Sequence, residues 1–367
     1  MGGIQSYLER FVAEIVARRG SDSIVVFASV QHEKEAQLFD DTQGYTIIRW
    51  PRRIMLPTPA TIRKMQHLIR AYSIDTVWFG AAAPLAVMAT HARRAGARRI
   101  VSTTHGHEVG WSMLPGARSV LRRIGNSSDV LTYVSEYTRG RFSRACGDHP
   151  EYVPLPSGVD TEFFRPATPT QRAQTRRRFG IGDAPFVVVP SRLVARKGQD
   201  QLIRGWEEVT KAVLEARLGI IGEGAYRSTL EKLAAPHQAS VSFFGRLPRE
   251  EMRDLVAAAD VMAMPARTRG GGLDVEGLGI VYLEAQACGI PVIAGNSGGA
   301  PETVRVDTGI VVDGRDTAAI TDAVVELLSD GDRRQAMGAA GREHVATTFS
   351  WDVLAGRLED CLFPARD

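Results

Sequence analysis

The sequence predicts an α/β protein in which two Rossmann-like domains face each other across a cleft. The chain has 367 residues, too many for one ordinary hydrophobic core and suited to two. Short apolar runs alternate with helical stretches, which is typical of parallel α/β layers. The alternation occurs as two series, so we expect two parallel sheets with ligand-binding loops at the carboxyl ends of their strands.

The first series belongs to an N-terminal domain predicted over residues 1–158. Helical patterns such as Pro84–Ala95 and Tyr137–Ala145 lie between its strands. The strands are expected at the apolar runs Ile24–Ala28, Thr46–Trp50, Thr76–Gly80, Arg99–Thr103, Val130–Val134 and Tyr152–Leu155.

The start of the chain departs from this pattern. A glycine pair that opens a helix normally follows a strand, because glycines let a ligand approach the backbone and the helix N-terminus. Gly2-Gly3 has no strand before it. We therefore expect the first strand of the N-terminal domain to be missing, and a frayed terminus is the alternative.

The second series belongs to a C-terminal domain predicted over residues 185–350. The turn-rich run Pro156–Pro166 should connect the domains, with residues 159–184 as linker and first helix. Trp351–Leu362 reads as a helix, and residues 351–367 could pack back on the first domain. The strands of the second domain are expected at Phe186–Pro190, Arg217–Ile221, Val241–Phe244, Asp260–Met264, Pro291–Ala294 and Gly309–Val312.

Composition and charge argue against several classes of protein. No apolar run reaches the roughly 20 residues of a membrane-spanning helix, and the first residues lack the pattern of a secretory signal. A formal net charge of +3 does not suggest a nucleic-acid-binding protein. The cysteines Cys146, Cys288 and Cys361 are far apart and odd in number, which favours a reducing cytoplasm over a disulfide framework.

The segment 265–304 combines dense glycines with two glutamates that are separated by seven residues, Glu276 and Glu284. We place Glu276 ahead of three backbone N–H groups that open a helix, those of Gly279, Ile280 and Val281. A helix N-terminus attracts diphosphate, and Glu284 inside the helix could accept hydrogen bonds from ribose hydroxyls. Such a pair of carboxylates suits a nucleotide sugar. The alternative is a glycine-rich loop with two solvated glutamates.

A second cluster of functional residues lies in the run Pro190–Gly198, between a predicted strand and a predicted helix. Arg192 and Lys197 would reach a diphosphate from the same side. Their charges would offset the charge that develops on a departing nucleoside diphosphate. A basic surface turn is the alternative, but the glutamate pair favours function.

A third cluster follows the strand Arg99–Thr103, where His105 is the better candidate for contact with the donor sugar. His-x-His-Glu contains three possible metal ligands, but no further Cys or His cluster completes a site, so no metal is expected. Two satisfied loop histidines are the other alternative, above all for His107. The turns at Gly222–Gly224 and Gly245–Leu247 could hold the nucleotide base through backbone groups, and tight turns explain them equally well.

Taken together, these residues resemble the retaining two-Rossmann (GT-B) glycosyltransferases over nearly the whole chain. The segments THGHEVGWSMLPG and PARTRGGGLDVEGLGIVYLEAQACG are most similar to actinobacterial phosphatidylinositol mannosyltransferases, and closest to those that add the second mannose. The resemblance is carried by Gly2-Gly3, Ser157–Asp160, Arg192 with Lys197, Glu276 with Glu284, and Gly298–Glu302.

The resemblance implies a role for each candidate residue. Arg192 and Lys197 would grip the diphosphate, while Glu276 would hold the mannose. Glu284 would hold the ribose, and His105 would lie beside the transferred sugar. The family needs no metal or other cofactor and retains the anomeric configuration.

The resemblance also implies the substrates. The donor would be GDP-mannose, and the acceptor phosphatidylinositol monomannoside, which would receive an α-1,6-type linkage to inositol to give the dimannoside. Gly3 and Gln5 would line the site where donor and acceptor meet.

A lipid acceptor implies contact with the inner face of the cell membrane. The stretch Trp50–Tyr72 mixes apolar residues such as Met65 and Leu68 with basic residues, a combination that suits an anionic membrane surface. By periodicity alone, an amphipathic helix packed on the sheet is favoured, whereas the resemblance favours a cytoplasmic protein bound peripherally. The basic residues of interest are Arg52, Arg53, Arg63 and Lys64.

Other functions stay open on the sequence alone. A dehydrogenase would need a complete G-x-G-x-x-G after the first strand and a downstream acid, which are lacking. A non-catalytic nucleotide- or glycan-binding module is not expected to keep both glutamates and both cations. Within the enzymes, the alternative is a transferase that uses another nucleotide sugar and a soluble acceptor. The identity of the base stays open because backbone groups, which every residue has, would contact it.

Overall fold

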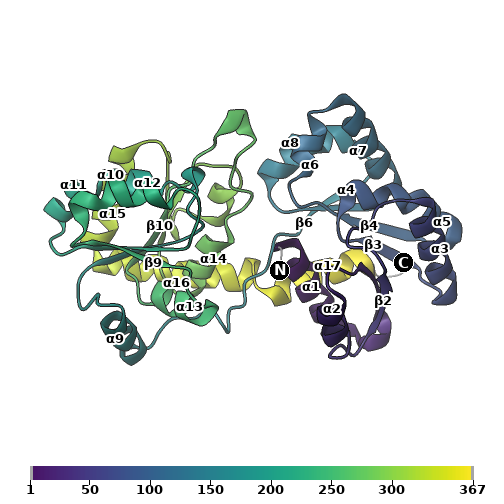
Figure 1. Ribbon diagram of the computed structural model, residues 1–367, viewed down its shortest axis with the longest axis horizontal. Coiled ribbons are helices and arrows are strands. Elements are labelled where there is room, and N and C mark those ends of the chain that lie inside the picture. The colour runs from purple at the N-terminus through teal and green to yellow at the C-terminus, as the bar shows by residue number, and fades with distance from the viewer. Residues whose placement is uncertain (1–2, 365–367) are drawn as a thin grey trace. The chain divides into compact units, whose positions relative to one another are not determined.

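The computed structural model describes residues 3–364 and shows two compact α/β units (Figure 1). Unit 1 comprises the described residues up to Ser157 together with those from Trp351 onward. Unit 2 is Gly158–Ser350. Each unit has its own hydrophobic core, as expected of a domain.

The strands of unit 1 are all parallel and form two sheets, in the orders β1-β2 and β3-β4-β5-β6. Each agrees with a predicted strand, with ends shifted by no more than one residue. They are β1 (Val25–Ser29), β2 (Thr46–Trp50), β3 (Thr76–Phe79), β4 (Arg99–Thr103), β5 (Val130–Tyr133) and β6 (Glu151–Pro154).

Within the described residues, β1 pairs only with β2, and β3 pairs only with β4. Each therefore keeps one edge that is not hydrogen-bonded to another described strand. Gly2 lies outside the described residues, and Gly3 is the first residue of α1. An additional strand ahead of α1 stays a prediction.

The helices of unit 1 cover these sheets and include one that was not predicted correctly. The sequence predicted a single helix over Pro84–Ala95, but the structure has a short helix, a 3-10 turn at Ala86–Met88 and a second helix. The helices are α1 (Gly3–Arg19), α2 (Glu33–Asp40), α3 (Pro59–Ala71), α4 (Ala82–Leu85), α5 (Ala89–Ala95), α6 (Glu108–Ser112), α7 (Pro115–Ser127), α8 (Glu136–Cys146) and α17 (Trp351–Leu362).

The last helix, α17, packs against α1. Phe11 and Ile15 of α1 share one buried cluster with Leu354 and Leu358 of α17. The Arg18 guanidinium lies 2.5 Å from an Asp352 carboxylate oxygen at the edge of this contact. The end of the chain is thereby part of the core of unit 1.

Unit 2 contains one parallel sheet in the order β12-β11-β10-β7-β8-β9. The order reverses at β7, whose neighbours are β8 on one side and β10 on the other. In open α/β sheets, ligands bind at the carboxyl ends of the strands beside such a switch point. The strands are β7 (Phe186–Pro190), β8 (Arg217–Ile221), β9 (Val241–Gly245), β10 (Val261–Met264), β11 (Val292–Gly295) and β12 (Gly309–Val312).

Helices pack against this sheet and bury its apolar strands. The helices are α9 (Pro169–Arg178), α10 (Gln199–Arg204), α11 (Trp206–Ala212), α12 (Arg227–Ala234), α13 (Arg249–Ala257), α14 (Ile280–Ala287), α15 (Thr317–Ser329) and α16 (Gly331–Thr348).

The segment that follows Ser157 is packed rather than free. Val159 and Phe164 are both 2% exposed and belong to the core of unit 2. The Val159 N–H donates to the Phe349 carbonyl at 2.8 Å. The turn-rich run predicted as a linker is therefore anchored in unit 2 from Val159 onward.

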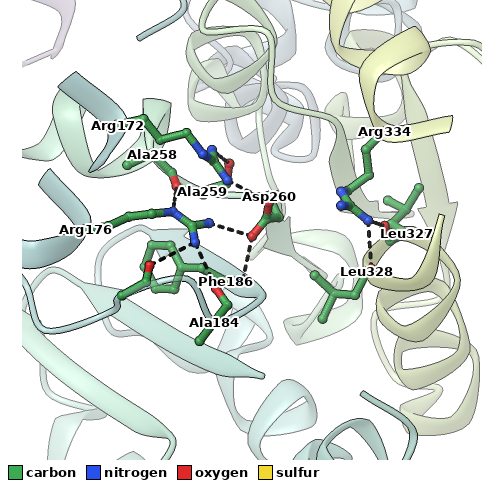
Figure 2. Close-up of polar contacts among 11 residues, drawn as sticks. Arg172, Arg176, Ala184, Phe186, Ala258, Ala259, Asp260, Leu327, Leu328 and Arg334 are labelled. Atoms are coloured by element: carbon green, nitrogen blue, oxygen red, sulfur yellow. Dashed lines mark hydrogen bonds and ion pairs between the residues drawn. The ribbon is translucent and has the colours of Figure 1, made fainter. Parts of the chain in front are cut away.

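The helix α9 is fixed to unit 2 by arginines that converge on Asp260 (Figure 2). Arg172 and Arg176 each place a guanidinium nitrogen within 2.7 Å of an Asp260 carboxylate oxygen. The same carboxylate accepts the Phe186 N–H at 2.8 Å. Arg176 also donates to the carbonyl of Ala258 at 2.9 Å. These contacts join α9 to the starts of β7 and β10.

Candidate active site

Two loops meet at the switch point of unit 2, one after β7 and one after β10. Gly198 ends the first loop in a left-handed conformation (φ 79°). A Cβ on Gly198 would lie 2.0 Å from the Pro265 carbonyl oxygen of the second loop. Only glycine permits this approach, so the backbone itself brings the two predicted clusters together.

Glu276 is held by cations of the first loop. It is 8% exposed, and its Oε2 atom lies 2.6 Å from Lys197 Nζ and 2.5 Å from a guanidinium nitrogen of Arg196. Arg196 also contacts Asp274 at 3.1 Å. A buried carboxylate requires such partners. The structure thus brings Glu276 and Lys197, which the sequence analysis assigned to two separate clusters, into direct contact.

Burial and neighbouring charges shift the pKa of Lys197. Burial lowers the pKa of Lys197 below its ordinary value, although Glu276 favours the charged form. The nearby guanidinium groups of Arg196 and Arg192 lower this pKa further. Arg192 is exposed and forms no ion pair with the described residues, so its guanidinium can meet a ligand from solvent.

The helix α14 begins directly after the Glu276 loop. Its N-cap, Gly279, has φ 88°, and a Cβ there would lie 2.5 Å from the Tyr282 ring. The helix starts at Ile280, one residue before the predicted start. The N–H groups of Ile280 and Val281 belong to the first turn, where no intrahelical acceptor exists. They form an electropositive end beside Glu276 that suits an anion.

Glu284 lies one turn inside α14 and is half-buried. Burial raises the pKa of Glu284 to about 7, and Arg249 opposes this rise. The carboxylate is therefore poised to exchange a proton near neutral pH, and it could accept hydroxyl hydrogen bonds when ionised.

The glycine turns after β8 have a packing explanation. A Cβ on Gly222 would lie 2.2 Å from the Ser191 carbonyl oxygen, and one on Gly224 would lie 2.2 Å from that of Leu193. The Leu193 N–H also donates to Glu223 O at 2.9 Å. These glycines let the β8 turn support the loop that carries Arg192.

In unit 1, the loop after β4 positions His105. Its Nε2 lies 2.6 Å from the Gly80 carbonyl oxygen, and its ring meets the Tyr7 ring edge-on at 5.2 Å. Because a carbonyl only accepts, Nε2 carries the proton. Burial lowers the pKa of His105, so the neutral ring keeps Nδ1 as an acceptor.

Glu108 organises this loop from within. Its side chain is fully buried, and Oε2 accepts the N–H groups of His105 and Gly106, both at 3.1 Å. His107 Nε2 lies 3.0 Å from the Ala83 carbonyl oxygen. The two histidines thus tie this loop to the segment that follows β3, while Glu108 binds the backbone of the loop itself. Among residues 3–364, no group of His, Cys, Asp and Glu is arranged to hold a metal ion.

The remaining predicted residues lie on the surface of unit 1. Gln5 is exposed on α1 and donates to Glu9 at 2.8 Å. In the stretch Trp50–Tyr72, Arg52, Arg53 and Arg63 are exposed and Lys64 is half-buried. Met65 and Leu68, which were predicted to contribute to a membrane surface, are buried. That prediction is wrong for these two residues, because the apolar stripe of α3 faces the core.

Sequence reasoning missed Arg196, Asp274 and Glu108. Arg196 adjoins Lys197 and could have been considered on that ground, whereas nothing in the sequence distinguishes Asp274 from a solvated loop residue. Glu108 stands in the motif that was singled out, but its acceptance of two backbone N–H groups is a matter of loop geometry.

Comparisons with known proteins decide the family. Residues 171–344 match the glycosyl transferases group 1, and residues 1–163 match glycosyltransferase family 4. The GDP-mannose-dependent monoacylated alpha-(1-6)-phosphatidylinositol monomannoside mannosyltransferase of Corynebacterium glutamicum is 56% identical over 99% of this chain and 94% of its own length. The GDP-mannose-dependent alpha-(1-6)-phosphatidylinositol monomannoside mannosyltransferase of Mycobacterium tuberculosis is 54% identical over 98% of this chain and 94% of its own length. The chain belongs to this family of mannosyltransferases.

Solved structures confirm the fold of the mannosyltransferase. Anabaena HepE in complex with UDP superposes with a TM-score of 0.78 over 98% of this chain and 96% of its own, at 18% identity. A glycosyltransferase from Rickettsia africae superposes with a TM-score of 0.77 over 99% of this chain and 97% of its own, also at 18% identity. These structures confirm the predicted two-domain GT-B fold, and the mannosyltransferase relatives confirm the predicted enzyme class, a hexosyltransferase.

Proposed function

We propose that this mannosyltransferase moves mannose from GDP-mannose to phosphatidylinositol monomannoside, with retention of configuration. The observation that carries the proposal is the cluster of Glu276, Lys197 and Arg196 beside the N-terminus of α14, in a chain 56% identical to an enzyme of that name. Product formation gives an α-1,6-type linkage to inositol and yields the dimannoside.

The cations of the loop after β7 suit the donor diphosphate. Lys197 has three N–H donors, and Glu276 takes one of them. The others are available to phosphate oxygens, together with the exposed guanidinium of Arg192 and the first N–H groups of α14. These groups would offset the negative charge that develops on GDP as it departs. A transferase that uses no metal needs its own side chains and backbone groups to do this.

The carboxylates suit the two sugars of the donor. Glu276, fixed by its cations, would accept hydrogen bonds from the hydroxyls of mannose and hold the anomeric carbon toward the acceptor. Glu284 would accept from the ribose. His105, which keeps Nδ1 as an acceptor, would meet the transferred sugar, and Gly3 and Gln5 of α1 would contribute to acceptor binding.

The membrane would supply the acceptor. Among the described residues, no helix has the length and apolarity to cross a bilayer. We propose that the chain is cytoplasmic and binds the inner face of the cell membrane peripherally. Arg52, Arg53, Arg63 and Lys64 provide positive charge, and the exposed large hydrophobic residues of the stretch Trp50–Tyr72 are Ile54, Leu56 and Tyr72.

A transfer assay tests the activity. Purified protein is incubated with labelled nucleotide sugars and with lipid or soluble acceptors. We expect transfer from GDP-mannose to phosphatidylinositol monomannoside. Transfer only to soluble acceptors, or only from another nucleotide sugar, would contradict the proposal.

Two variants test the site itself. Glu276→Gln and Lys197→Ala should each lower kcat at least about a hundredfold, because a preorganised charge at the reacting sugar or diphosphate is lost. The matched surface changes Glu231→Gln and Lys211→Ala should leave kcat unchanged. Thermal unfolding checks that the variants fold. A folded Glu276→Gln protein with the wild-type rate would disprove the role of Glu276.

A further inference from the structure

Unit 1 exposes two large apolar side chains between α6 and α7. Met113 is 52% and Leu114 is 62% exposed. Leu114 is the N-cap of α7 and provides no side-chain cap. Ser, Thr, Asp or Asn is preferred at an N-cap because its side chain accepts a free N–H. Leucine at this position contributes neither to the cap nor to the core, so its apolar surface is free for a partner.

Five exposed arginines lie on the two helices beside this pair. Leu114 O accepts the Arg118 N–H at 2.8 Å, and Ser112 Oγ donates to Arg141 O at 3.2 Å. Arg118 thus lies one helical turn after Leu114, and Arg141 of α8 contacts Ser112, the residue before Met113. None of the five forms an ion pair with residues 3–364. They are Arg118, Arg122 and Arg123 on α7, and Arg141 and Arg144 on α8.

The charge of this region is strongly one-sided. α7 contains no acidic residue, and α8 contains only Glu136, which contacts Arg139 at 2.9 Å. Arg118 and Arg122 line an open depression with Ser119 and Ala145. The Arg122 guanidinium also donates to the Arg144 carbonyl at 2.9 Å. Arginine side chains at one depression offer several N–H donors to a phosphate group.

We propose that Met113, Leu114 and these five arginines form a membrane-binding tip that takes an anionic phospholipid surface. The two apolar side chains would insert at the boundary between headgroups and acyl chains, while the arginines would contact lipid phosphates. The proposal rests on the proposed function, because a lipid acceptor brings the chain to a bilayer. The tip also provides exposed apolar side chains for insertion, whereas Met65 and Leu68 of α3 are buried.

Vesicle co-sedimentation of the whole chain tests the tip. The probes are vesicles of phosphatidylcholine alone and of equal parts phosphatidylcholine and phosphatidylglycerol. Met113→Ser/Leu114→Ser and Arg118→Ser/Arg122→Ser should each lower partitioning onto the anionic vesicles about tenfold. Leu214→Ser/Val306→Ser and Arg165→Ser/Arg177→Ser are matched controls, because they remove exposed residues of the same kind from unit 2. The controls should bind as the wild type does.

A second measurement separates the tip from the catalytic site. Transfer from GDP-mannose to an acceptor dispersed in detergent micelles should be unchanged in the tip variants, whereas transfer to acceptor in anionic vesicles should fall about tenfold. A loss of transfer in micelles would overturn the proposal, because the tip would then belong to the acceptor site.

The remaining outcomes distinguish the two proposals. If the wild-type protein does not bind anionic vesicles, both peripheral membrane binding and the tip are disproved. Wild-type binding that the tip variants retain in full would overturn the tip alone and leave the surface at Arg52–Lys64. Equal binding to both kinds of vesicle would also overturn the tip. Wild-type protein that binds anionic vesicles but transfers no mannose would refute the proposed function alone.

Discussion

Glu276 keeps its place in unit 2 because two cations hold one of its carboxylate oxygens, and Arg196 is the one that also reaches Asp274. Arg196 has a side chain only 14% exposed. Its carbonyl accepts the Arg267 N–H at 2.8 Å, so backbone and side chain both join the loop after β7 to the loop after β10. We regard it as a positioning residue for Glu276.

Arg196→Ala should lower kcat/KM for GDP-mannose about tenfold, because Lys197 still holds Glu276 while Asp274 loses its partner. Arg196→Lys should recover part of this loss, since an ammonium group can reach one carboxylate. Steady-state kinetics measures both variants, with the exposed Arg204→Ala as control. Wild-type kinetics in Arg196→Ala, or no recovery in the lysine variant, would contradict this role.

The same residues show how far the sequence predicted the site. Glu276 and Lys197 were predicted because their types and spacing already suit a diphosphate sugar, whichever way the loops fold. Arg196 was not assigned a role, because adjacent basic residues look alike in a sequence. Only the turn at Ala195–Lys197 determines that both side chains reach Glu276 while Arg192 stays exposed.

At the scale of elements, α9 depends on one carboxylate. Asp260 binds Arg172, Arg176 and the Phe186 N–H, as Figure 2 shows. Arg176 is 7% exposed, so its charge has little access to water. Loss of the carboxylate would leave this guanidinium uncompensated, which is costlier than the loss of an exposed ion pair.

Asp260→Asn should therefore reduce the free energy of unfolding by about 3 kcal/mol. Asp307→Asn removes an exposed partner of Arg305 and should change it by less than about 0.5 kcal/mol. Urea unfolding followed by circular dichroism measures the difference. Equal stability of the two variants would show that Asp260 does not anchor α9.

The strands were predictable and some helices were not, for physical reasons. A buried parallel strand is a short apolar run between turn residues, so its ends agree with the sequence pattern to about one residue. The break between α4 and α5 lies in the alanine-rich stretch Ala82–Ala95. Alanine fits α and 3-10 turns alike, so periodicity does not reveal the break. The separation of β1-β2 from β3-β6 depends on long-range pairing, which no local pattern encodes.

At the scale of the whole molecule, each of the two units has a core of its own and could in principle fold alone. Glu284 belongs to unit 2, and burial raises the pKa of Glu284 to about 7. In the unfolded chain this pKa returns to its ordinary value near 4.5. Between these two values the folded unit binds more protons than the unfolded chain.

The free energy of unfolding therefore falls as pH rises through this window, because the folded unit must give up the proton that it binds more tightly than the unfolded chain does. The contribution of Glu284 is fully present below pH about 4.5 and is lost as pH rises through about 7, a difference on the order of 3 kcal/mol. Glu284→Gln mimics the protonated acid, so its unit 2 should unfold at the wild-type temperature at pH 4 and at a higher temperature than wild type at pH 8. Scanning calorimetry resolves the transition, with Glu231→Gln as an exposed control. If wild type and Glu284→Gln shift in parallel over this range, Glu284 is ionised in the folded protein throughout, and its proposed exchange of a proton near neutral pH is wrong.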